Sequence, residues 1–344
     1  MLRRRFLKGS ALASTLLLAS ERIAAAAGSA RESSSGRTTA RHRIVMGGYG
    51  PATTGFSLAL RQIGERLQAR FGDEVEVRYV YNILDLGYRA DDILWLVEQG
   101  VLTLGYQSSS YLTERVRDLG VADLPFVFPD TQQARASMDG RLGKLLAAQI
   151  EAAMNYRILG YFENGFRHVS NRLRPIRVPA DMQGMKIRVL PSKVQARTFE
   201  LLGAVPKVMD LSEVLDAVKS GALDAQENPF ANTVTYGVHQ YHRFHTATNH
   251  FYLSRPIFLH RQTFDAWPRA LQEEFRSAVH DAVLFQRDLH VREEDEAMTA
   301  IRAAGGEILE LTPSEHARFV AAVTPLYGEA RREYSRELLS LLNV

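Results

Sequence analysis

The sequence predicts an α/β protein built as two lobes. Predicted helices alternate with short strands from Arg43 onward, and one arrangement, a helix, a glycine, a strand and a polar tip, occurs twice. The chain has 344 residues, of which 46% are hydrophobic, which is enough for two cores. It has no cysteine, so disulfides, thiolate metal sites, a cysteine nucleophile and a lipid-modified cysteine are excluded.

The N-terminus has the features of an export signal. Residues 3–8 read Arg-Arg-Arg-Phe-Leu-Lys, an apolar run covers 11–20, and small residues follow at 24–28. The apolar run is shorter than the ~20 residues that span a bilayer. The order Arg-Arg-x-Phe-Leu-Lys predicts twin-arginine export to the periplasm, and an ordinary secretory signal is the alternative. We expect residues 1–27 to be the signal peptide and 28–42 to be a disordered lead-in.

The charge of the mature chain differs from that of the precursor. Residues 1–27 contain five basic side chains and one acidic side chain, a net charge of +4, whereas the whole chain carries +3. The remainder therefore carries about −1 by the same count. A basic surface for a polyanion is not expected, and nucleic acid is not a predicted partner.

The first half predicts strands over 43–46 and 75–81, with a glycine-rich turn at 47–51 and a helix between them. The apolar residues of that helix, on one face, are Phe56, Leu60, Ile63 and Leu67. A helix over 91–98 then ends at Gly100. A strand over 101–106 follows, and its polar tip is Gln107, Ser108, Ser109 and Ser110.

The second half repeats this arrangement. Asp210 and Glu213 predict a capping box for a helix that ends at Gly221, and a strand over 222–225 follows with a polar tip at 226–229. Ligands of open α/β sheets bind beyond the carboxyl ends of strands, so the two tips predict a binding cleft. The alternative is that the repeat is the helix-glycine-strand succession common to any α/β protein. Two further strands are predicted over 158–162 and 187–189, and the polar segment 164–171 follows the first.

The segment from Pro268 to Ala304 contains no internal glycine or proline and has a regular apolar pattern. As one helix it would be about 55 Å long at 1.5 Å per residue. Either it breaks at an unmarked turn or it runs through both lobes. A strand over 308–311 and a closing helix pair follow, and Pro313 is the first residue of that pair after the cap at Thr312.

No catalytic signature is present: the chain lacks a G-x-S-x-G elbow, an H-E-x-x-H motif, a P-loop and a C-x-x-C motif. Gly48-x-Gly50 follows a strand, but Thr53 replaces the third glycine of a dinucleotide fingerprint. The best metal candidate is a cluster of four histidines. Their spacing places them around a helix rather than on one face, and no carboxylate lies nearby in the sequence, so ordinary surface and turn histidines are favoured over a metal site. Its residues are His239, His242, His245 and His250.

Two arginines are candidates for anion binding. Arg188 alternates with Ile187 and Val189 and should point away from the core that those two face. The planar fork of a guanidinium matches a carboxylate with two parallel hydrogen bonds. Arg167, in the polar segment after the strand over 158–162, is the second candidate. The alternative for both is a surface or inter-strand salt bridge.

The stretch from Met182 to His250 resembles the solute-binding proteins of TRAP (tripartite ATP-independent periplasmic) transporters. The residues that carry the resemblance are 184–188 (Gly-Met-Lys-Ile-Arg), 202–206 (Leu-Gly-Ala-Val-Pro), Glu213-Val214, 221–229 (Gly-Ala-Leu-Asp-Ala-Gln-Glu-Asn-Pro) and 248–250 (Thr-Asn-His), with 124–128 and 164–167 upstream. Together with the long C-terminal helix, which is also a family trait, these segments extend the resemblance over nearly the whole mature chain.

The resemblance implies a two-lobed periplasmic-binding-protein-like fold with a ligand cleft between the lobes and a long C-terminal helix that spans both. Lobe I would comprise 43–163 plus about 251–285, and lobe II 164–250 plus about 286–344. It also implies a small organic acid as ligand, membrane subunits of a TRAP transporter as partners, and no cofactor.

Residue by residue, Arg188 matches the arginine that pairs with the ligand carboxylate, and Arg167 matches a second basic residue of the cleft. Asn228 matches an asparagine that hydrogen-bonds the ligand, with Phe230 as a neighbouring wall. The other lobe would contribute Gln107, Ser108, Ser109 and Tyr49.

The sequence departs from the family pattern at the glycine-rich turn 47–51 and in the run 222–225 (Ala-Leu-Asp-Ala), which has alanine where glycine is usual before Gln-Glu-Asn. The substrate therefore carries over only as a class, either mono- or dicarboxylate. Two alternatives stay open: a binding protein that serves sensing rather than uptake, and an exported cofactor-dependent enzyme.

Overall fold

A computed structural model describes residue 15 and residues 18–26, 41–342 and 344. Residues 18–26 are helical, and the rest of the predicted export signal and nearly all of the lead-in lie outside the described residues. The chain divides into unit 1 (Met1–Gln107, Met154–Gly160 and Ile257–Leu284) and unit 2 (Ser108–Ala153, Tyr161–Pro256 and Phe285–Val344). Residues 108–153, expected in lobe I, thus belong to unit 2.

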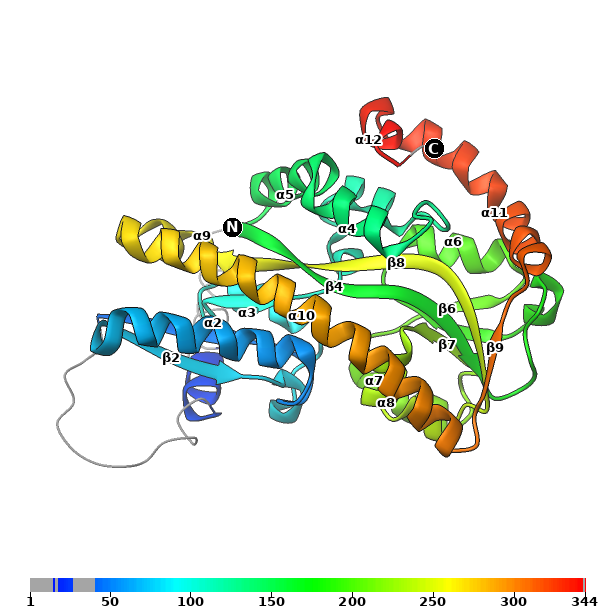
Figure 1. The fold of residues 1–344 in the computed structure, drawn as a ribbon, viewed down its shortest axis with the longest axis horizontal. Helices are drawn as coiled ribbons and strands as arrows, with labels where there is room; N and C mark the ends of the chain where they lie inside the picture. The colour runs from blue at the N-terminus through cyan, green and yellow to red at the C-terminus, as the bar shows by residue number, and fades with distance from the viewer. Residues whose placement is uncertain (1–14, 16–17, 27–40, 343) are drawn as a thin grey trace, which may run out of the picture. The chain divides into compact units, whose positions relative to one another are not determined.

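Unit 1 is a sheet with helices on it, as the alternating pattern predicts (Figure 1). Its strand order is β2-β1-β3-β8, where β8 covers Phe244–His260. Strand β1 is parallel to β2 and β3, and β3 is antiparallel to β8. The predicted strand over 101–106 is shorter in the structure, at Leu104–Tyr106. The elements of this unit are β1 (His42–Gly47), α2 (Gly55–Phe71), β2 (Val75–Val80), α3 (Asp92–Glu98), β3 (Leu104–Tyr106) and α9 (Arg261–Asp265).

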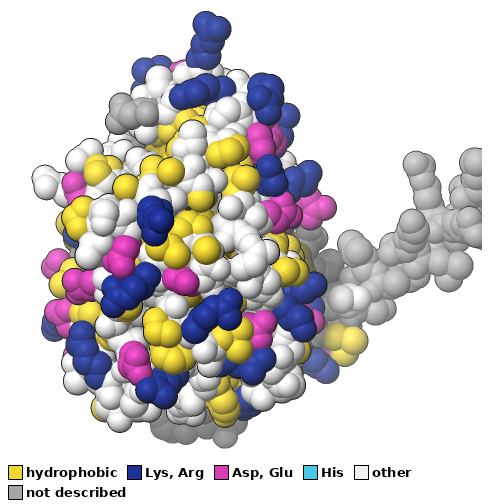
Figure 2. Space-filling view, turned by 90° about the vertical axis from the view of Figure 1, so that its right-hand side faces the viewer, with side chains coloured by type: hydrophobic (Ala, Val, Ile, Leu, Met, Phe, Trp, Pro, Cys, Tyr) yellow, Lys and Arg dark blue, Asp and Glu magenta, His cyan; other side chains and the backbone are white. Residues whose placement is uncertain are grey.

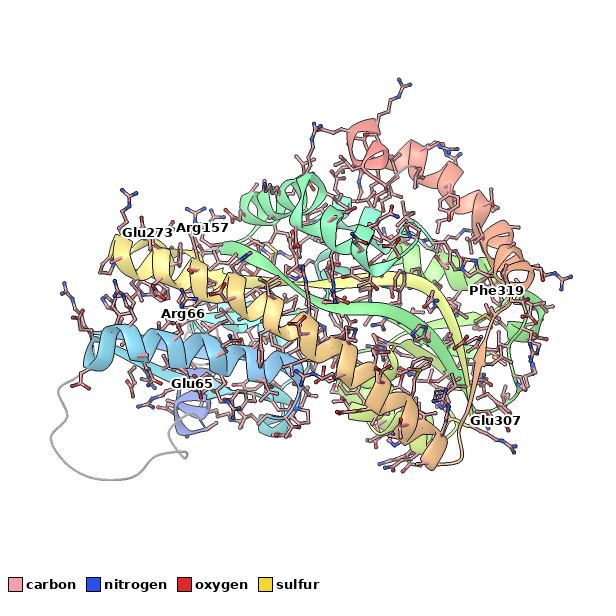
Figure 3. The ribbon with its side chains drawn as sticks, in the orientation of Figure 1. Glu65, Arg66, Arg157, Glu273, Glu307 and Phe319 are labelled. Atoms are coloured by element: carbon pink, nitrogen blue, oxygen red, sulfur yellow. The ribbon has the colours of Figure 1, made fainter. Side chains whose placement is uncertain are left out.

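Helix α2 contains the apolar positions that the sequence predicts, and it begins at Gly55 because the side chain of Thr54 accepts a hydrogen bond from the backbone N–H of Ser57. Its apolar face is buried, with Leu60, Ile63 and Leu67 fully inaccessible. On its other side lies Arg66, which is labelled in Figure 3. Arg66 hydrogen-bonds Glu274 of α10 (Arg269–Ala303) at 2.6 Å. Unit 1 therefore includes the first part of α10.

Unit 2 contains a sheet with the order β4-β7-β5-β6, in which β7 is antiparallel to β4 and parallel to β5. β9 (Glu307–Glu310) pairs in parallel with β8 (Phe244–His260). The other strands are β4 (Tyr156–Asn171), β5 (Lys186–Val189), β6 (Val205–Val208) and β7 (Ala225–Asn228), and the helices are α4 (Thr131–Asp139), α5 (Arg141–Ala153), α6 (Lys193–Leu201), α7 (Leu211–Lys219), α8 (Phe230–Thr235), α11 (Pro313–Glu333) and α12 (Arg336–Ser340).

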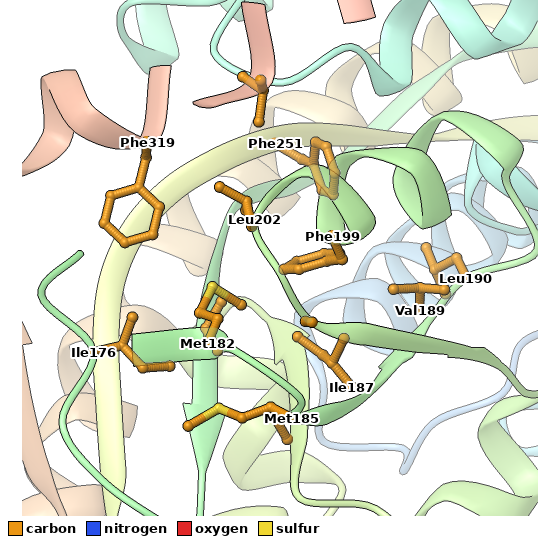
Figure 4. Packing of buried hydrophobic residues seen from close by; sticks show 14 of the residues in the cluster. Ile176, Met182, Met185, Ile187, Val189, Leu190, Phe199, Leu202, Phe251 and Phe319 are labelled. Carbon is orange, nitrogen blue, oxygen red and sulfur yellow. The ribbon is translucent and has the colours of Figure 1, made fainter. Parts of the chain in front are cut away.

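One hydrophobic core lies on a single face of the unit 2 sheet. Ile187 and Val189 of β5 and Phe199 of α6 are fully buried in it, and Phe319 of α11 closes it (Figure 4). Arg197 of α6 also hydrogen-bonds Glu329 of α11 at 3.1 Å. Because Ile187 and Val189 face this core, Arg188 between them points to the opposite face, as predicted.

Two strands differ from the prediction. The strand predicted over 158–162 continues to Asn171, so the polar segment 164–171 is part of β4. The strand predicted over 222–225 instead covers Ala225–Asn228, so the expected polar tip lies inside the sheet. Both predictions treated polar residues as exposed, yet all four residues of β7 are buried between β4 and β5.

The predicted long helix is continuous. α10 covers 35 residues, of which 269–284 belong to unit 1 and 285–303 to unit 2. After β9, α11 begins with the predicted cap: Thr312 accepts from the N–H of Glu315 at 3.3 Å, and Glu315 accepts from the N–H of Thr312 at 2.8 Å.

Within the described part of the chain, no helix combines the length and apolar character that crossing a membrane requires. The face shown in Figure 2 intersperses basic and acidic side chains without a large patch of one sign.

Candidate functional site

Three neighbouring strands of unit 2, β4, β5 and β7, carry Arg167, Arg188 and Asn228. In the register, Arg188 of β5 pairs with Gln226 of β7, and Asn228 of β7 pairs with His168 of β4. Because side chains alternate along a strand, Arg188, Gln226 and Asn228 lie on one face of the sheet. Arg167 lies on the other face, the one that carries the hydrophobic core. The structure thus brings Asn228 to the face of Arg188 but not Arg167.

The guanidinium of Arg188 is buried and donates hydrogen bonds to two uncharged groups. Arg188 as a whole is only 2% exposed. Its Nε donates to the carbonyl of Met209 at 2.9 Å, and its Nη2 donates to the hydroxyl of Tyr111 at 3.1 Å. Among the described residues, no Asp or Glu oxygen lies within 4.0 Å of this guanidinium. Arg188 is therefore a buried cation whose charge is not paired by any acidic side chain in the described part of the chain.

The guanidinium of Arg167, by contrast, has an acidic partner. Its Nη2 donates to Oε1 of Glu227 at 2.7 Å and to the Glu227 carbonyl at 2.6 Å, while its Nε bonds Oε2 of the same carboxylate. Its Nη1 donates to Oδ1 of Asn164 at 2.8 Å. The inter-strand salt bridge that the sequence left open for Arg167 is thus present.

Glu227 is the centre of this buried group. Burial alone would favour its neutral form, but the charge and hydrogen bonds of Arg167 outweigh burial and hold the pKa of Glu227 below its ordinary value. His250 lies 3.5 Å from Oε2 of Glu227. Burial lowers the pKa of His250, against the opposing pull of Glu227. An ionised Glu227 and a neutral His250 follow at neutral pH.

Asn228 is held in place by a chain of hydrogen bonds. Its Nδ2 donates to Oε1 of Gln226 at 2.5 Å, and Nε2 of Gln226 donates to the hydroxyls of Ser170 and Thr233 at 3.0 Å each. The polar side chains of Gln226 and Asn228 inside β7 therefore have hydrogen-bond partners, which offsets the free-energy cost of burying them. The amide of Asn228 is a preoriented hydrogen-bonding group.

Phe230 begins α8 and is buried beside the same face. Its ring stacks on His168 with centroids 4.2 Å apart. The carboxylate of Glu294 accepts hydrogen bonds from the backbone N–H groups of Phe230 and Ala231, at 3.2 Å and 2.8 Å. These contacts fix the first turn of α8 and with it the apolar wall next to Asn228.

Ser108 and Ser109 belong to unit 2, at the start of a 3-10 turn over Ser109–Leu112. Ser108 bonds Ser110 at 3.3 Å, and Ser110 donates to Oδ1 of Asp123 at 2.8 Å. Asp123 is fully buried, and burial raises its pKa to about 6 although hydrogen bonds from serine and glutamine side chains lower it. The same turn carries Tyr111, the hydrogen-bond partner of Arg188. By accepting from Ser110, Asp123 therefore supports the positions of both Ser108 and Tyr111.

The remaining candidates, Gln107 and Tyr49, belong to unit 1. Nε2 of Gln107 donates to the carbonyl of Ala90 at 2.6 Å. Tyr49 pairs with Asn82 in an isolated bridge, and its ring lies 5.4 Å from that of Tyr106. Both side chains are buried in their own unit.

The histidines differ from the expectation of surface and turn positions. His242, His245 and His250 are each 1% exposed, and burial lowers their pKa values, to about 3 for His242 and about 4 for His245. His245 bonds the carbonyl of His242, and His242 bonds Ser170, so both serve packing. Across the described residues, no group of three or more His, Cys, Asp or Glu side chains could hold a metal ion.

Sequence reasoning did not single out the groups that hold the two arginines. Glu227 belongs to the predicted polar tip 226–229, whereas Tyr111 and Asp123 lie outside the segments singled out in the sequence. Glu227 could have been found, because it lies within the same run as Asn228 and alternates with it. Tyr111 and Asp123 have no local signal, since their partners lie 77 and 13 residues away.

Comparison with known proteins places this fold and these strands in one family. The family model "Bacterial extracellular solute-binding protein, family 7" (DctP) matches residues 50–333. The C4-dicarboxylate-binding periplasmic protein DctP of Rhodobacter capsulatus is 31% identical over 226 residues, 65% of this chain and 67% of that protein. The 2,3-diketo-L-gulonate-binding periplasmic protein YiaO of Escherichia coli is 27% identical over 252 residues, 73% of this chain and 76% of that protein.

A solved structure agrees with these relatives. A TRAP periplasmic solute-binding protein from Roseobacter denitrificans with bound β-D-glucuronate superposes with a TM-score of 0.81 and 26% identity, over 88% of this chain and 99% of that one. The family model covers well over half of the sequence. The chain therefore belongs to the family 7 bacterial extracellular solute-binding proteins.

Proposed function

We propose that this protein is the solute-binding component of a TRAP-type transporter and captures a small organic acid outside the cytoplasm. One observation carries the proposal: the guanidinium of Arg188 is buried, and its hydrogen-bond partners are uncharged. Family membership and the organic acids named for the relatives support the same ligand class. The ligand would then pass to the membrane subunits of the transporter.

The energetic argument starts from the cost of an unpaired buried charge. Removing a cation from water costs several kcal/mol unless an anion and hydrogen bonds compensate it. Met209 and Tyr111 use Nε and one N–H of Nη2, and Nη1 of Arg188 has no partner among the described residues. Nη1 and Nη2 can therefore present two parallel N–H groups, the arrangement that binds a carboxylate.

The other candidates complete the proposal. Asn228, Ser108 and Ser109 would hydrogen-bond the ligand, and Phe230 would pack against it. Gln107 and Tyr49 would contribute from unit 1, and closure of two lobes over the ligand stays a prediction. Since Glu227 neutralises Arg167, we propose that Arg167 acts by fixing the strand end next to Asn228 and by its local field rather than as a second full charge.

Export of this protein fits the same role. Relatives are named periplasmic binding proteins, and we propose the periplasm as the location and the twin-arginine pathway as the route. We propose binding rather than catalysis, because the chain lacks recognisable catalytic signatures. No cofactor is part of the proposal.

A thermal-shift screen of the purified mature protein tests the proposed function. The panel holds mono- and dicarboxylates, keto acids, sugar acids and aromatic acids, with uncharged sugars as controls. A ligand at 100 times its dissociation constant stabilises the folded state by ~2.7 kcal/mol, which raises the melting temperature measurably. A shift with organic acids alone is expected. A panel in which no acid raises the melting temperature would refute the assignment.

A further inference from the structure

A short helix near the N-terminus packs against the folded chain. This signal helix covers residues 18–26, inside the predicted export signal, and is drawn in the darkest blue of Figure 1. Ala19 is 3% exposed and Ile23 is 2% exposed, whereas Leu18 is 59% exposed. Ala19 and Ile23 are four positions apart, so they lie on one face of the helix. That face is therefore buried, and Leu18 lies outside it.

The signal helix belongs to unit 1 and lies next to Tyr88. Burial raises the pKa of the Tyr88 hydroxyl, and the positive charge of Arg22 opposes that rise, so the two side chains are close. Tyr88 follows the 3-10 turn Ile83–Leu86, and its ring centroid lies 6.2 Å from that of Trp95 on α3. The signal helix thus docks in the region of this turn and of α3.

Packing has to stabilise the signal helix, because the helix is short. Nine residues form about two and a half turns, and isolated helices shorter than ~12–15 residues are marginal in water. Burial of the side chains of Ala19 and Ile23 removes apolar surface from water, which favours the docked state. Ile23 is among the largest fully buried side chains of the described residues. The helix therefore depends on the folded surface of unit 1.

The signal helix overlaps the predicted processing segment. The apolar run of the signal covers residues 11–20, and the small residues that a signal peptidase requires follow at 24–28. Residues 24–26 of this segment are helical, and Ala24 and Ala26 are half-buried. Proteases cleave chain segments that have opened locally, so a docked helix resists cleavage. Docking of the helix and processing at this segment therefore exclude one another.

We infer that folded unit 1 holds the C-terminal part of the export signal as a docked helix, which shields the processing segment until the helix detaches. The inference goes beyond solute binding and rests on the proposed export of a folded precursor. Ile23 is the anchor of the contact, and the occupant of this surface in the precursor is the protein's own signal. Removal of the signal opens the same surface of unit 1 to water.

Limited proteolysis of the full-length precursor tests the docking. The precursor is made by cell-free translation and treated with trypsin, and mass spectrometry measures the rate of cleavage after Arg22. Ile23→Ser weakens the contact and should raise this rate at least about tenfold, because cleavage follows the detached population. Leu18→Ser, on the exposed side of the same helix, is the matched control and should leave the rate unchanged.

Peptides of residues 15–30 with the same changes give the intrinsic preference of trypsin, by which the rates in the precursor are corrected. A corrected rate that rises for Ile23→Ser alone supports the docked helix. Equal corrected rates for Ile23→Ser, Leu18→Ser and the unmodified precursor overturn the inference.

Thermal unfolding gives a second measurement. A docked signal stabilises the folded state as a bound ligand does, so the precursor should melt at a higher temperature than the chain that begins at residue 28. Ile23→Ser in the precursor should remove this difference, and Leu18→Ser should keep it. Equal melting temperatures of the precursor and the shorter chain overturn the inference. Acid binding is measured on the shorter chain, so failure of the docking leaves the proposed function intact.

Discussion

Arg167 and Glu227 form a buried ion pair on the face of the unit 2 sheet opposite to Arg188. The carboxylate accepts hydrogen bonds from Nε and Nη2 of one guanidinium, and both residues are at most 1% exposed. Two arginines that look alike in the sequence thus have different roles. One is part of the protein's internal structure, and the other is the residue that we propose binds an external anion.

Removing Arg167 should destabilise the protein severely. Arg167→Met leaves Glu227 buried without a counter-ion, which costs about 3–5 kcal/mol of unfolding free energy. Urea unfolding measures the change. Arg172→Met is the matched control, since Arg172 bonds Asp224 on the surface and should cost less than about 1 kcal/mol. Equal stabilities for the two variants would contradict the role assigned to the buried pair.

The glycine next to this pair should tolerate no side chain. Gly165 has φ of +85°, and a Cβ there would lie 2.3 Å from Nε2 of His290. Gly165→Ala should therefore cost at least about 1–3 kcal/mol in chemical denaturation. Gly160→Ala, in the same strand but with its nearest contact at 3.6 Å, is the control and should cost less than about 1 kcal/mol. If both changes cost the same, backbone strain at Gly165 is not the cause.

Stability should decrease as the pH is lowered from neutrality. Burial lowers the pKa of His168 and His242 to about 3 and that of His245 and His290 to about 4, so all four are neutral when folded and take up a proton on unfolding below about pH 6.5. Two buried acids oppose this, since burial raises the pKa of Asp123 to about 6 and of Glu294 to about 7.

The balance favours the histidines, because four proton uptakes outweigh two releases between about pH 6.5 and 4.5. Each net proton changes the unfolding free energy by on the order of 1 kcal/mol per pH unit. Urea unfolding at pH 7 and pH 5 measures the difference, and His242→Gln should reduce it. Equal or greater stability at pH 5 would show that the buried histidines do not dominate.

Export should depend on the paired arginines of the signal. Arg3→Lys combined with Arg4→Lys should stop twin-arginine export, so the precursor would accumulate in the cytoplasm. Immunoblotting of periplasmic and cytoplasmic fractions measures this. Arg5→Lys, at the variable position of the motif, serves as the control. Normal periplasmic levels of the Arg3/Arg4 variant would assign the signal to the ordinary secretory route instead.

The parts of the fold that local pattern determines could be predicted from the sequence. The flanking Ile187 and Val189 gave the direction of Arg188, the capping residues Thr312 and Glu315 gave the start of α11, and the absence of glycine and proline gave the unbroken α10. Each depends on residues within a few positions of one another.

Features that depend on distant partners could not be predicted. β7 lies three residues later than expected, because its polar side chains find partners on β4 and elsewhere in unit 2, so polarity there does not mean exposure. The partner of Arg167 is 60 residues away, and nothing in the spacing of either residue indicates the pairing. The burial of the histidines could not be predicted for the same reason.

The role of Arg188 can be measured directly by the affinity of Arg188→Lys for the best acid found in the screen. Lysine keeps the charge but loses the planar fork, so titration calorimetry should show a loss of at least about tenfold, whereas Arg172→Lys should bind as the unmodified protein does. An Arg188→Lys protein that is folded and binds the acid with unchanged affinity would contradict the assignment of the carboxylate to this arginine.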